Sequence, residues 1–441
     1  MKRRGNNLIV SLILLAGLFG VQLVAQSDEQ PHKQPIHYVI KALSTLGGTV
    51  GVGEAINNKG WITGAANLPG DTTQHAALWR RGVITDLGTL GGPSSRVVGG
   101  VKNTRGEVAG GSETSIPDPL GETFCSTFVA AFSGQPLICL PFVWRSGVMS
   151  PLPTLGGNNG FAFGGVNNRG QIAGFAENAV QDPACTPPEV LDFEPVIWGP
   201  REGEIQALPP PAGDTVGIAT EVNNHGQAVG ATALCSAFVT GIVHAVLWHS
   251  GAVIDLGDLG SQKGNWAYAI NDRGQVVGAG GVTGGNTWHA FLWQDGAMSD
   301  LGVLPGDFMS QANGMNNKGQ VVGTSCNDVS FDLCHGFLWQ DGVMTDLDTL
   351  IQPNSSLSTY IANDINDRGE IAGAAIDLNT GASPGFVMIP CDEQHADVGD
   401  CKDPVEKTPD QLSGTKERRK VILPGSIRRQ LRRRAGFVPT S

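Results

Sequence analysis

The sequence predicts an all-β protein, a seven-bladed β-propeller of four-stranded antiparallel blades closed by an N-terminal strand in the last blade. Three observations lead to this prediction. Four short apolar segments recur in constant order over residues 37–390, turns of fixed composition join them, and no stretch has helical periodicity. Glycine supplies 62 of 441 residues, which suits many short strands joined by tight turns.

The four repeated elements have distinct signatures. The first ends in Asn, the second begins and ends with Gly, as in GQVVG (274–278), and the third and fourth form HAFLWQDGAMSDL (289–301). The first three elements occur seven times, and the third ends in Trp in six copies. We expect this aromatic position to pack between adjacent blades, at Trp79, Trp144, Trp198, Trp248, Trp293 and Trp339.

An N-x-x-G turn joins the first two elements in every copy. Asn at the first position and Gly at the fourth are typical of a type I turn, because Asn bonds back to the backbone and Gly accepts a positive φ. W-x-x-G turns join most third and fourth elements, so the strands are antiparallel neighbours, unlike those of a parallel β-helix. The N-x-x-G glycines are Gly60, Gly106, Gly170, Gly226, Gly274, Gly319 and Gly369.

Ring closure is predicted from the two ends of the repeat region. The last copy stops after GFVMI (385–389) and lacks a fourth strand, whereas YVIKALSTLGG (38–48) aligns with the fourth element VITDLGTLGG (83–92). The N-terminal segment therefore supplies the missing strand. A ring closed in this way leaves no open sheet edge at its two ends.

Both termini differ from the repeats. Residues 1–25 have the basic start and apolar stretch of a secretory signal, with an uncleaved membrane anchor as the alternative. Residues 26–411 carry 40 acidic and 17 basic residues, whereas residues 412–441 carry one acidic and nine basic. We expect a secreted protein (extracellular, at the cell surface or periplasmic) with a disordered basic tail over 391–441. This tail contacts an anionic envelope surface or, as the alternative, remains free in solution. The acidic body disfavours nucleic acid.

Eight cysteines in an exported chain indicate disulfide bonds. Spacing alone does not determine the connectivity, and reduced cysteines are the alternative. The favoured pairs close three short loops and join two neighbouring blades: Cys125 with Cys139, Cys326 with Cys334, Cys391 with Cys401, and Cys185 with Cys235. No cysteine spacing matches a zinc site, and we predict neither a metal nor a cofactor.

The combination of H-A-F-L-W, D-L-G-T-L-G-G and I-N-x-x-G-Q-V-V-G resembles the HAF repeat family of predicted extracellular bacterial proteins. The similarity covers residues 38–390, although the second and third units lack the His and contain insertions. The resemblance implies export and repetition, but no defined reaction.

Two recurring polar positions are interpreted as structural. Aligned residues on the third and fourth strands of different blades cannot converge on one ion. We therefore expect hydrogen bonds from the histidines and turn capping by the aspartates. These residues are His75, His244, His289 and His335, and Asp86, Asp255, Asp300 and Asp346.

Candidate ligand-binding residues lie where the repeat is interrupted. All large insertions (113–140, 177–194, 231–243 and 324–334) connect a second to a third strand and so emerge on one face. Aromatic and acidic side chains in them suit a carbohydrate or peptide ligand, with ordinary solvated loops as the alternative. They are Phe124, Phe128, Phe132, Asp118, Glu122, Asp182, Glu189, Asp192 and Glu194.

The sequence thus predicts a monomeric exported binding or scaffolding module that uses the insertion-rich face and the mouth of the central channel. The alternative is a secreted polysaccharide lyase or hydrolase on a propeller frame. Such an enzyme needs two carboxylates, or a His with a Tyr or carboxylate, converging near the axis. We identify no catalytic residue, because the sequence shows no such set and neither a G-x-S-x-G nor an H-E-x-x-H motif.

Overall fold

The structure is a computed structural model that describes residues 37–99, 103–125, 135–185, 187–240, 243–284, 287–352, 354–398, 401 and 420–434. The chain divides into two units, Met1–Pro35 and Ile36–Ser441. The predicted signal segment lies outside the described residues. Within the described ranges, no helix is both long enough and apolar enough to span a bilayer.

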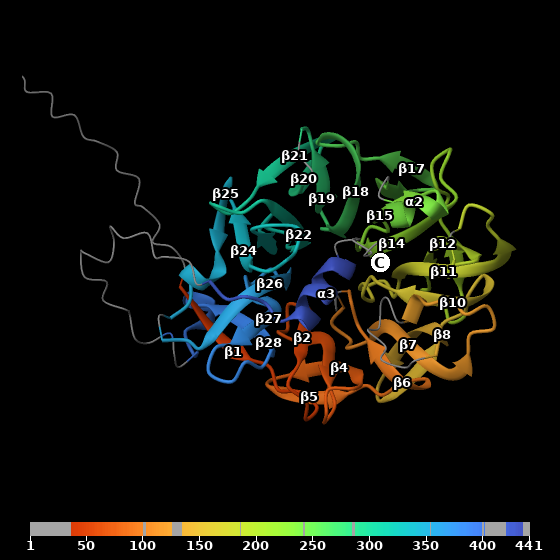
Figure 1. The fold of residues 1–441 in the computed structure, drawn as a ribbon. Coiled ribbons are helices and arrows are strands. Elements are labelled where there is room, and N and C mark those ends of the chain that lie inside the picture. The colour runs from red at the N-terminus through yellow and green to blue at the C-terminus, as the bar shows by residue number, and fades with distance from the viewer. Residues whose placement is uncertain are drawn as a thin grey trace, which may run out of the picture. The chain divides into compact units, whose positions relative to one another are not determined.

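The described chain folds into seven four-stranded antiparallel sheets around a central axis, which confirms the predicted β-propeller (Figure 1). Each sheet is one blade. In blades 1 to 6 the strands follow chain order from the axis to the rim. The repeat boundaries agree with the sequence pattern, because each N-x-x-G or W-x-x-G segment becomes a hairpin turn.

Blade 1 contains β2 (Gly51–Ile56), β3 (Ile62–Asn67), β4 (Gln74–Arg80) and β5 (Val83–Asp86). Blade 2 contains β6 (Gly91–Arg96), β7 (Val108–Pro117), β8 (Leu137–Arg145) and β9 (Val148–Pro151). Blade 3 contains β10 (Gly156–Ala162), β11 (Ile172–Gln181), β12 (Leu191–Trp198) and β13 (Ile205–Ala207). Blade 4 contains β14 (Val216–Val222), β15 (Ala228–Ala233), β16 (His244–His249) and β17 (Ala252–Asp255), with the short helix α2 (Cys235–Thr240) after β15.

Blade 5 contains β18 (Gly260–Ile270), β19 (Val276–Val282), β20 (Trp288–Gln294) and β21 (Ala297–Gly302). Blade 6 contains β22 (Met309–Met315), β23 (Val321–Cys326), β24 (Cys334–Gln340) and β25 (Val343–Asp346), followed by the 3-10 helix η1 (Leu347–Thr349). Blade 7 contains β26 (Leu357–Ile365), β27 (Ile371–Asp377), β28 (Gly385–Pro390) and the N-terminal β1 (Tyr38–Ala42). A second 3-10 helix, η2 (Glu393–His395), follows blade 7.

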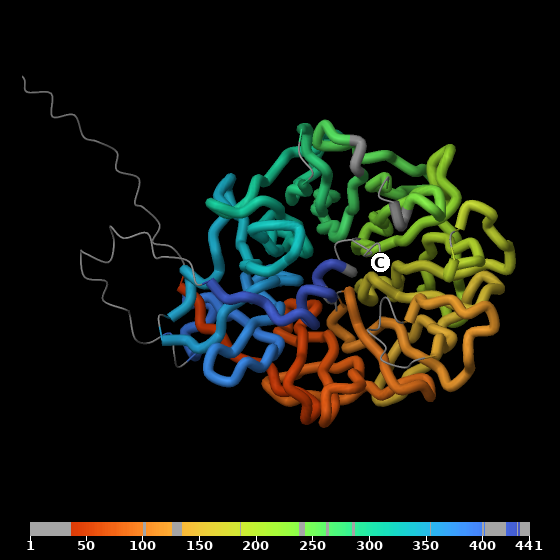
Figure 2. The backbone as a smooth tube through the Cα atoms, in the orientation of Figure 1, coloured from red at the N-terminus to blue at the C-terminus, as the bar shows by residue number. Residues whose placement is uncertain are grey.

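The ring closes in blade 7 as the sequence predicts. Strand β1 pairs antiparallel with β28, in a register that places Tyr38 opposite Pro390 and Ala42 opposite Phe386. Figure 2 shows these two ends of the propeller, red and blue, side by side. Tyr38 and Val39 are buried, so the closing strand contributes core side chains as well as backbone hydrogen bonds.

A second recurring glycine, the last residue of each G-x-x-x-G segment, is required by a close backbone approach. The first strand of most blades contains a β-bulge, for example between Gly53 and Ala55. The bulge brings a carbonyl against the facing glycine. A Cβ on Gly64 would lie 1.9 Å from the oxygen of Val52, closer than any side chain tolerates.

The N-x-x-G turns join neighbouring blades through a closed ring of hydrogen bonds. In each turn the Asn side-chain oxygen accepts backbone N–H groups of its own turn, and its Nδ2 donates to a backbone carbonyl of the next blade. Asn316, for example, accepts from Lys318 and Gln320 and donates to Asn366 at 2.9 Å. The donors of the ring are Asn57, Asn103, Asn167, Asn223, Asn271, Asn316 and Asn366, which returns to Asn57.

The repeated tryptophans pack between blades, as predicted. The indole nitrogens of Trp79, Trp198 and Trp248 donate to carbonyls of the segments that enter their blades, at 2.7–2.9 Å. All six lie in apolar clusters shared with the preceding blade. In Blade 7 the equivalent residue is Met388.

Residues 420–434 correct the prediction of a disordered tail. They contain helix α3 (Gly425–Arg434), which packs on the side of blades 6 and 7 that carries the 2–3 loops, near the axis (Figure 1). Leu423, Ile427 and Leu431 repeat every four residues and form an apolar stripe that is buried there. Arg428 pairs with Asp332 of the blade 6 insertion. The stripe is hidden in the sequence by the arginines around it; residues 402–419 and 435–441 lie outside the described residues.

Deletion of residues 37–43 removes the closing strand and is expected to prevent stable folding. Burial of Tyr38, Val39 and Leu43 contributes about 2 kcal/mol each, comparable in sum with the whole stability of a typical domain. The truncated protein should aggregate or melt far below the parent protein in a thermal scan. Cooperative melting at the parent temperature would contradict this role of β1.

Replacement of one ring asparagine, Asn316→Ala, should lower the free energy of unfolding by about 2–3 kcal/mol. The substitution removes two caps on the turn and leaves a buried carbonyl of blade 7 without its donor. Urea denaturation measures the difference. The matched control Asn379→Ala, at an exposed loop position, should change stability by less than about 0.5 kcal/mol. Equal effects of the two substitutions would refute the importance of the ring.

Candidate functional site

The two faces of the propeller differ because all long connections lie on one of them. We call the side of the 2–3 and 4–1 loops the insertion face, and the side of the hairpin turns the turn face. On the insertion face, β7 and β8 extend beyond the regular blade height and pair as far as Pro117 and Leu137. Strands β11 and β12 do the same as far as Gln181 and Leu191.

Four disulfide bonds fasten this face and its surroundings, in the pairing that the sequence favours. Cys125–Cys139 and Cys326–Cys334 each close one insertion, and Cys391–Cys401 closes the segment after β28. Cys185–Cys235 joins the insertions of blades 3 and 4. Asp182 lies close to this last pair, but two cysteines in a disulfide have no thiolate to offer a metal.

Three of the predicted ligand-binding carboxylates connect the insertions of blades 2 and 3 with each other. The Glu122 carboxylate accepts the backbone N–H groups of Val190 and Leu191, both at 2.8 Å. Glu189 of the blade 3 insertion accepts a hydrogen bond from the Thr123 hydroxyl of the blade 2 insertion, at 3.0 Å. Asp118 caps its own loop by accepting from the N–H groups of Leu120 and Glu122.

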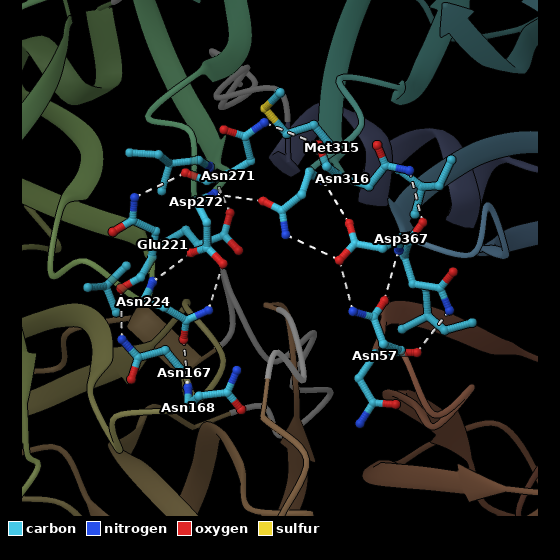
Figure 3. A pocket seen from close by; sticks show the side chains of 18 residues that line it. Asn57, Asn167, Asn168, Glu221, Asn224, Asn271, Asp272, Met315, Asn316 and Asp367 are labelled. Atoms are coloured by element: carbon cyan, nitrogen blue, oxygen red, sulfur yellow. Dashed lines mark hydrogen bonds between the residues drawn. The ribbon is translucent and has the colours of Figure 1, made fainter.

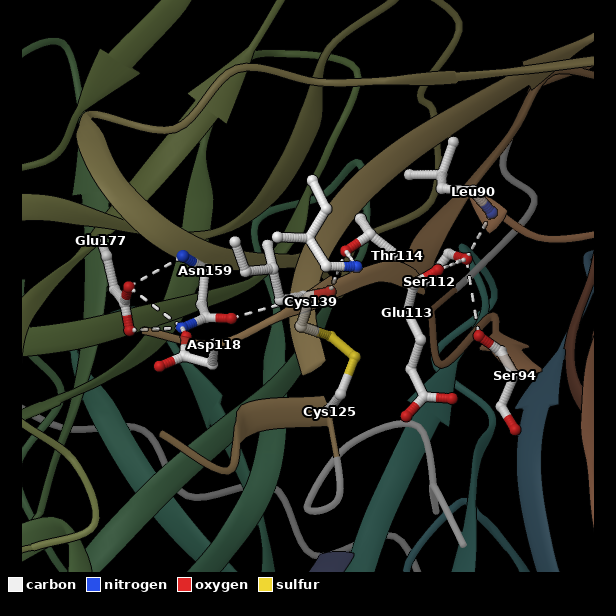
Figure 4. The surroundings of a disulfide bond; sticks show 12 residues. Leu90, Ser94, Ser112, Glu113, Thr114, Asp118, Cys125, Cys139, Asn159 and Glu177 are labelled. Carbon is white, nitrogen blue, oxygen red and sulfur yellow. Dashed lines mark hydrogen bonds between the residues drawn. A yellow bond between two sulfur atoms is a disulfide. The ribbon is translucent and has the colours of Figure 1, made fainter. Parts of the chain in front are cut away.

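A fourth carboxyl group, Glu177 on β11, belongs to this network, and Figure 4 shows it beside Asn159 and Asp118. Its oxygens accept from the backbone of Asn158 and Asn159 and from the Asn159 side chain. Asn159 also donates to Asp118, at 2.9 Å, and accepts from the backbone of Cys139. The sequence analysis did not identify Glu177, because it lies in a strand between small residues and nothing local marks it.

Burial raises the pKa values of these carboxyl groups. Glu177 has no exposed surface, and this burial together with the charge of Glu122 raises its pKa to about 8. Burial likewise raises the pKa of Glu189 to about 7 and that of Glu122 above its usual range. The nearby charge of Glu122 disfavours ionisation of Glu177, so Glu177 is the protonated member of the pair at neutral pH.

The prediction that Phe124 contacts a ligand is wrong. Phe124 is buried and packs against Phe175 and Phe193 with ring centroids 5.1 and 5.5 Å apart, so no ligand can stack on it. Phe128 and Phe132 lie outside the described residues. Asp192 and Glu194 both accept from Asn178 within blade 3, and Asp182 accepts from Thr215 of the next blade.

The network can hold protons, but it cannot act on a substrate in this conformation. General acid and nucleophile must both reach the scissile bond, whereas Glu122 and Glu177 are 1% and 0% exposed. Their neighbours are backbone amides and the apolar cluster around Phe175 and Cys235. The carboxylates thus join the insertions of blades 2 and 3 into one rigid body.

The recurring histidines and aspartates have the expected structural roles. His75 and His289 bond to Asp86 and Asp300 of the neighbouring strand at 2.9 Å. His244 instead bonds to Asp214 of the loop before its blade. Each of the recurring aspartates on the fourth strands accepts a hydrogen bond from the backbone N–H of the residue two positions later in the chain. His335 is buried, 4.0 Å from Asp307.

A polar cavity of about 180 Å³ lies on the axis at the turn face (Figure 3). It is lined by the first two residues of six N-x-x-G turns together with Glu221 and the apolar ends of first strands. The second turn residues form a chain of hydrogen bonds between blades, in which Asp272 accepts from Asn224 and Asp367 accepts from Asn317. The mouth of the channel therefore presents amide and carboxylate groups.

Comparisons with known proteins find similar structures but no related sequence. No protein-family model matches the chain, and no curated protein matches it. The resemblance to the HAF repeat family therefore stays a prediction.

Among solved structures, an acylaminoacyl peptidase of Pyrococcus horikoshii aligns with TM-score 0.39 and 12% identity, over 73% of this chain and 49% of the peptidase. A sialidase of Trypanosoma rangeli aligns with TM-score 0.38 and 9% identity, over 70% and 56%. A protein of unknown function from Dyadobacter fermentans aligns with TM-score 0.34 and 7% identity, over 80% and 98%. The chain spans about half the length of the peptidase and the sialidase, and these similarities support no inference about activity.

The raised pKa of Glu177 predicts that the protein loses stability as the pH rises. The pKa of Glu177 is about 8 in the folded protein and about 4.3 in the unfolded chain. The folded state therefore binds this proton more tightly, and the resulting contribution to stability is fully present below about pH 4.3 and is lost as the pH rises through about 8. We expect the free energy of unfolding to fall by on the order of 3 kcal/mol between about pH 5 and 9. Urea denaturation across this range measures the slope.

Glu177→Gln should flatten that slope, because the amide keeps the hydrogen-bonding shape and does not titrate. The matched control Glu202→Gln, at an exposed turn position, should leave the slope unchanged. Glu189, whose pKa is raised to about 7, accounts for a smaller remaining slope. A slope as steep as that of the wild type would place the main titrating group elsewhere.

Proposed function

We propose that this chain is an exported binding module that recognises a protein or peptide partner through the insertion face of blades 2 to 4. The observation that carries this proposal is the joining of three successive insertions into one preformed surface. We call residues 113–125, 177–194 and 231–240 the insertion block. Its members are held by Glu122 between blades 2 and 3 and by Cys185–Cys235 between blades 3 and 4.

A rigid block supports binding because less conformational entropy is lost when a partner docks. Surface loops that serve only as connections have no need for such cross-links. Here buried carboxylates, a disulfide and aromatic packing all stabilise residues that the regular propeller does not require.

The exposed side chains of the block support a partner that is partly apolar. Ile116, Leu120, Val180 and Leu234 are each at least 41% exposed, although the block is well packed beneath them. Large exposed apolar side chains on a rigid surface are typical of protein interaction sites. Asp182, Asp192 and Glu194 lie in the same segments, so we expect the partner to be basic as well as apolar.

The location outside the cytoplasm rests on two observations. The N-terminal 25 residues have the pattern of a secretory signal, and all eight cysteines pair in disulfide bonds, which persist in oxidising compartments.

The alternative, a polysaccharide lyase or hydrolase, is favoured by one observation only. The structure brings together two carboxyl groups, Glu122 and Glu177, whose pKa values are both raised, which the sequence analysis did not foresee. Their burial opposes this alternative, because a glycosidic bond cannot reach them.

Selection from a displayed library of random 12-residue peptides tests the proposal, with a polysaccharide array assayed for both binding and released products. We expect the wild-type protein to enrich peptides with apolar and basic residues. The triple variant Ile116→Ser, Leu120→Ser, Val180→Ser should lose at least ten-fold in affinity for them while keeping its melting temperature, because these side chains are exposed.

The control variant Ile254→Ser changes an exposed apolar residue on the outer strand of blade 4 and should bind like the wild type. Failure to enrich any peptide, or equal loss of affinity in the control, would refute the proposal. Product release from the array would establish the alternative.

A further inference from the structure

The charges of the propeller are divided between its two faces. Between residues 37 and 390 the chain has 14 Lys and Arg and 31 Asp and Glu residues. Ten of the basic residues, but only eight of the acidic ones, lie in the hairpin turns or at the strand ends next to them. The turn face is therefore slightly basic, whereas the rest of the propeller is strongly acidic.

Every N-x-x-G turn carries a basic residue at its third position. These seven residues, which we call the basic ring, are Lys59, Arg105, Arg169, His225, Arg273, Lys318 and Arg368. A type I turn needs Asn at its first position and Gly at its fourth, but it sets no requirement for charge at the third. Turn chemistry thus accounts for Asn and Gly and leaves the basic ring unexplained.

Several side chains of the basic ring extend to the N-x-x-G turn of the next blade and contact its backbone. Lys59 donates its Nζ hydrogen to the carbonyl of Thr104, and Arg105 donates Nη1 to that of Asn168, both at 2.8 Å. Arg273 and Arg368 lie over Gly319 and Gly60 in the same way. The cationic groups are thereby fixed in position around the central cavity.

These side chains also remain accessible to solvent. Six members of the basic ring are exposed and Arg368 is half-buried. Arg105 and Arg368 are partly neutralised by Glu107 and Glu370. No acidic side chain is paired with Arg169, Arg273 or Lys318 among the described contacts, and all three lie in blades 3, 5 and 6 around the cavity.

The cavity inside the basic ring has a different chemistry. It is lined by Asn amides, by Asp272, Asp367 and Glu221, and by no Lys or Arg. Its chain of amide hydrogen bonds is interrupted at blade 2, where Thr104 replaces Asn or Asp. The side chain of Asn168 at the edge of this gap is exposed and has no partner among the described residues. Amides and carboxylates arranged in a plane suit hydroxyl groups, which both donate and accept hydrogen bonds.

We propose that the turn face binds an acidic oligosaccharide, with a sugar residue in the axial cavity and the flanking carboxylates on the basic ring. The hydroxyl groups bond to the second residues of the turns, and Arg169, Arg273 and Lys318 pair with the acidic groups. Asp272 and Asp367 at the centre disfavour polyphosphate, which has no hydroxyl groups to donate hydrogen bonds to these carboxylates.

This site is separate from the insertion block on the opposite face. It does not depend on the proposed peptide partner, and the two sites are tested by different variants and different ligands.

The test measures binding of oligogalacturonate by isothermal titration calorimetry, with neutral galactan oligomers, polyphosphate and single-stranded DNA as comparison ligands. We expect oligogalacturonate to bind, and its affinity to fall as salt rises, because the contacts are ionic. The triple variant Arg169→Ala, Arg273→Ala, Lys318→Ala should lose at least ten-fold in affinity. A variant with Arg169→Lys and Arg273→Lys, which keeps the charges, should retain most of it.

The variant Ile116→Ser, Leu120→Ser, Val180→Ser on the insertion face should bind oligogalacturonate like the wild type. Melting temperatures of all variants verify that they are folded. Three outcomes would overturn the proposal: no binding of oligogalacturonate by the wild type, unchanged affinity in the triple alanine variant, or polyphosphate and DNA binding as tightly as oligogalacturonate.

Discussion

The architecture depends on seven asparagine side chains that tie the blades into a ring. Each Asn closes its own turn through Oδ1 and reaches the next blade through Nδ2, so the same residue shapes a hairpin and sets the spacing between blades. The ring has no end, because Asn366 of the last blade donates to Asn57 of the first. Breaking one bond leaves a buried carbonyl unsatisfied and loosens the contact between two whole sheets.

This constraint explains why the two faces of the molecule differ. A turn that must place Asn at its first position and Gly at its fourth cannot be lengthened without moving the amide away from the next blade. The N-x-x-G turns accordingly keep one length, and the large insertions lie at the opposite end of the blades, in the 2–3 loops. The short turns keep the axial cavity and the basic ring in regular array, whereas the long loops are free to extend, pair and cross-link. Each face thus offers a different kind of surface.

The acidic residues that the chain has in excess have different structural roles in the fold. One part is buried as Glu122, Glu177 and Glu189, whose pKa values are raised by burial. Another part attracts the basic C-terminal segment, since Arg428 pairs with Asp332 and Arg432 donates to the carbonyl of Ser330. Some basic residues of the C-terminal segment thus pair with groups of the acidic propeller, because helix α3 packs on blades 6 and 7.

The sequence alone determined the propeller and its closure through β1, because these follow from local periods and turn chemistry that repeat along the chain. It favoured the four cysteine pairs without determining them, and the structure decided the connectivity. The sequence could not locate the carboxylate network, since Glu122 and Glu177 are 55 positions apart and meet only when two blades pack. For the same reason the sequence analysis interpreted Phe124 as an exposed aromatic residue, whereas the structure shows that it is buried. Burial and charge proximity arise between strands distant in sequence, so only the tertiary structure decided which polar residues are exposed and which face one another.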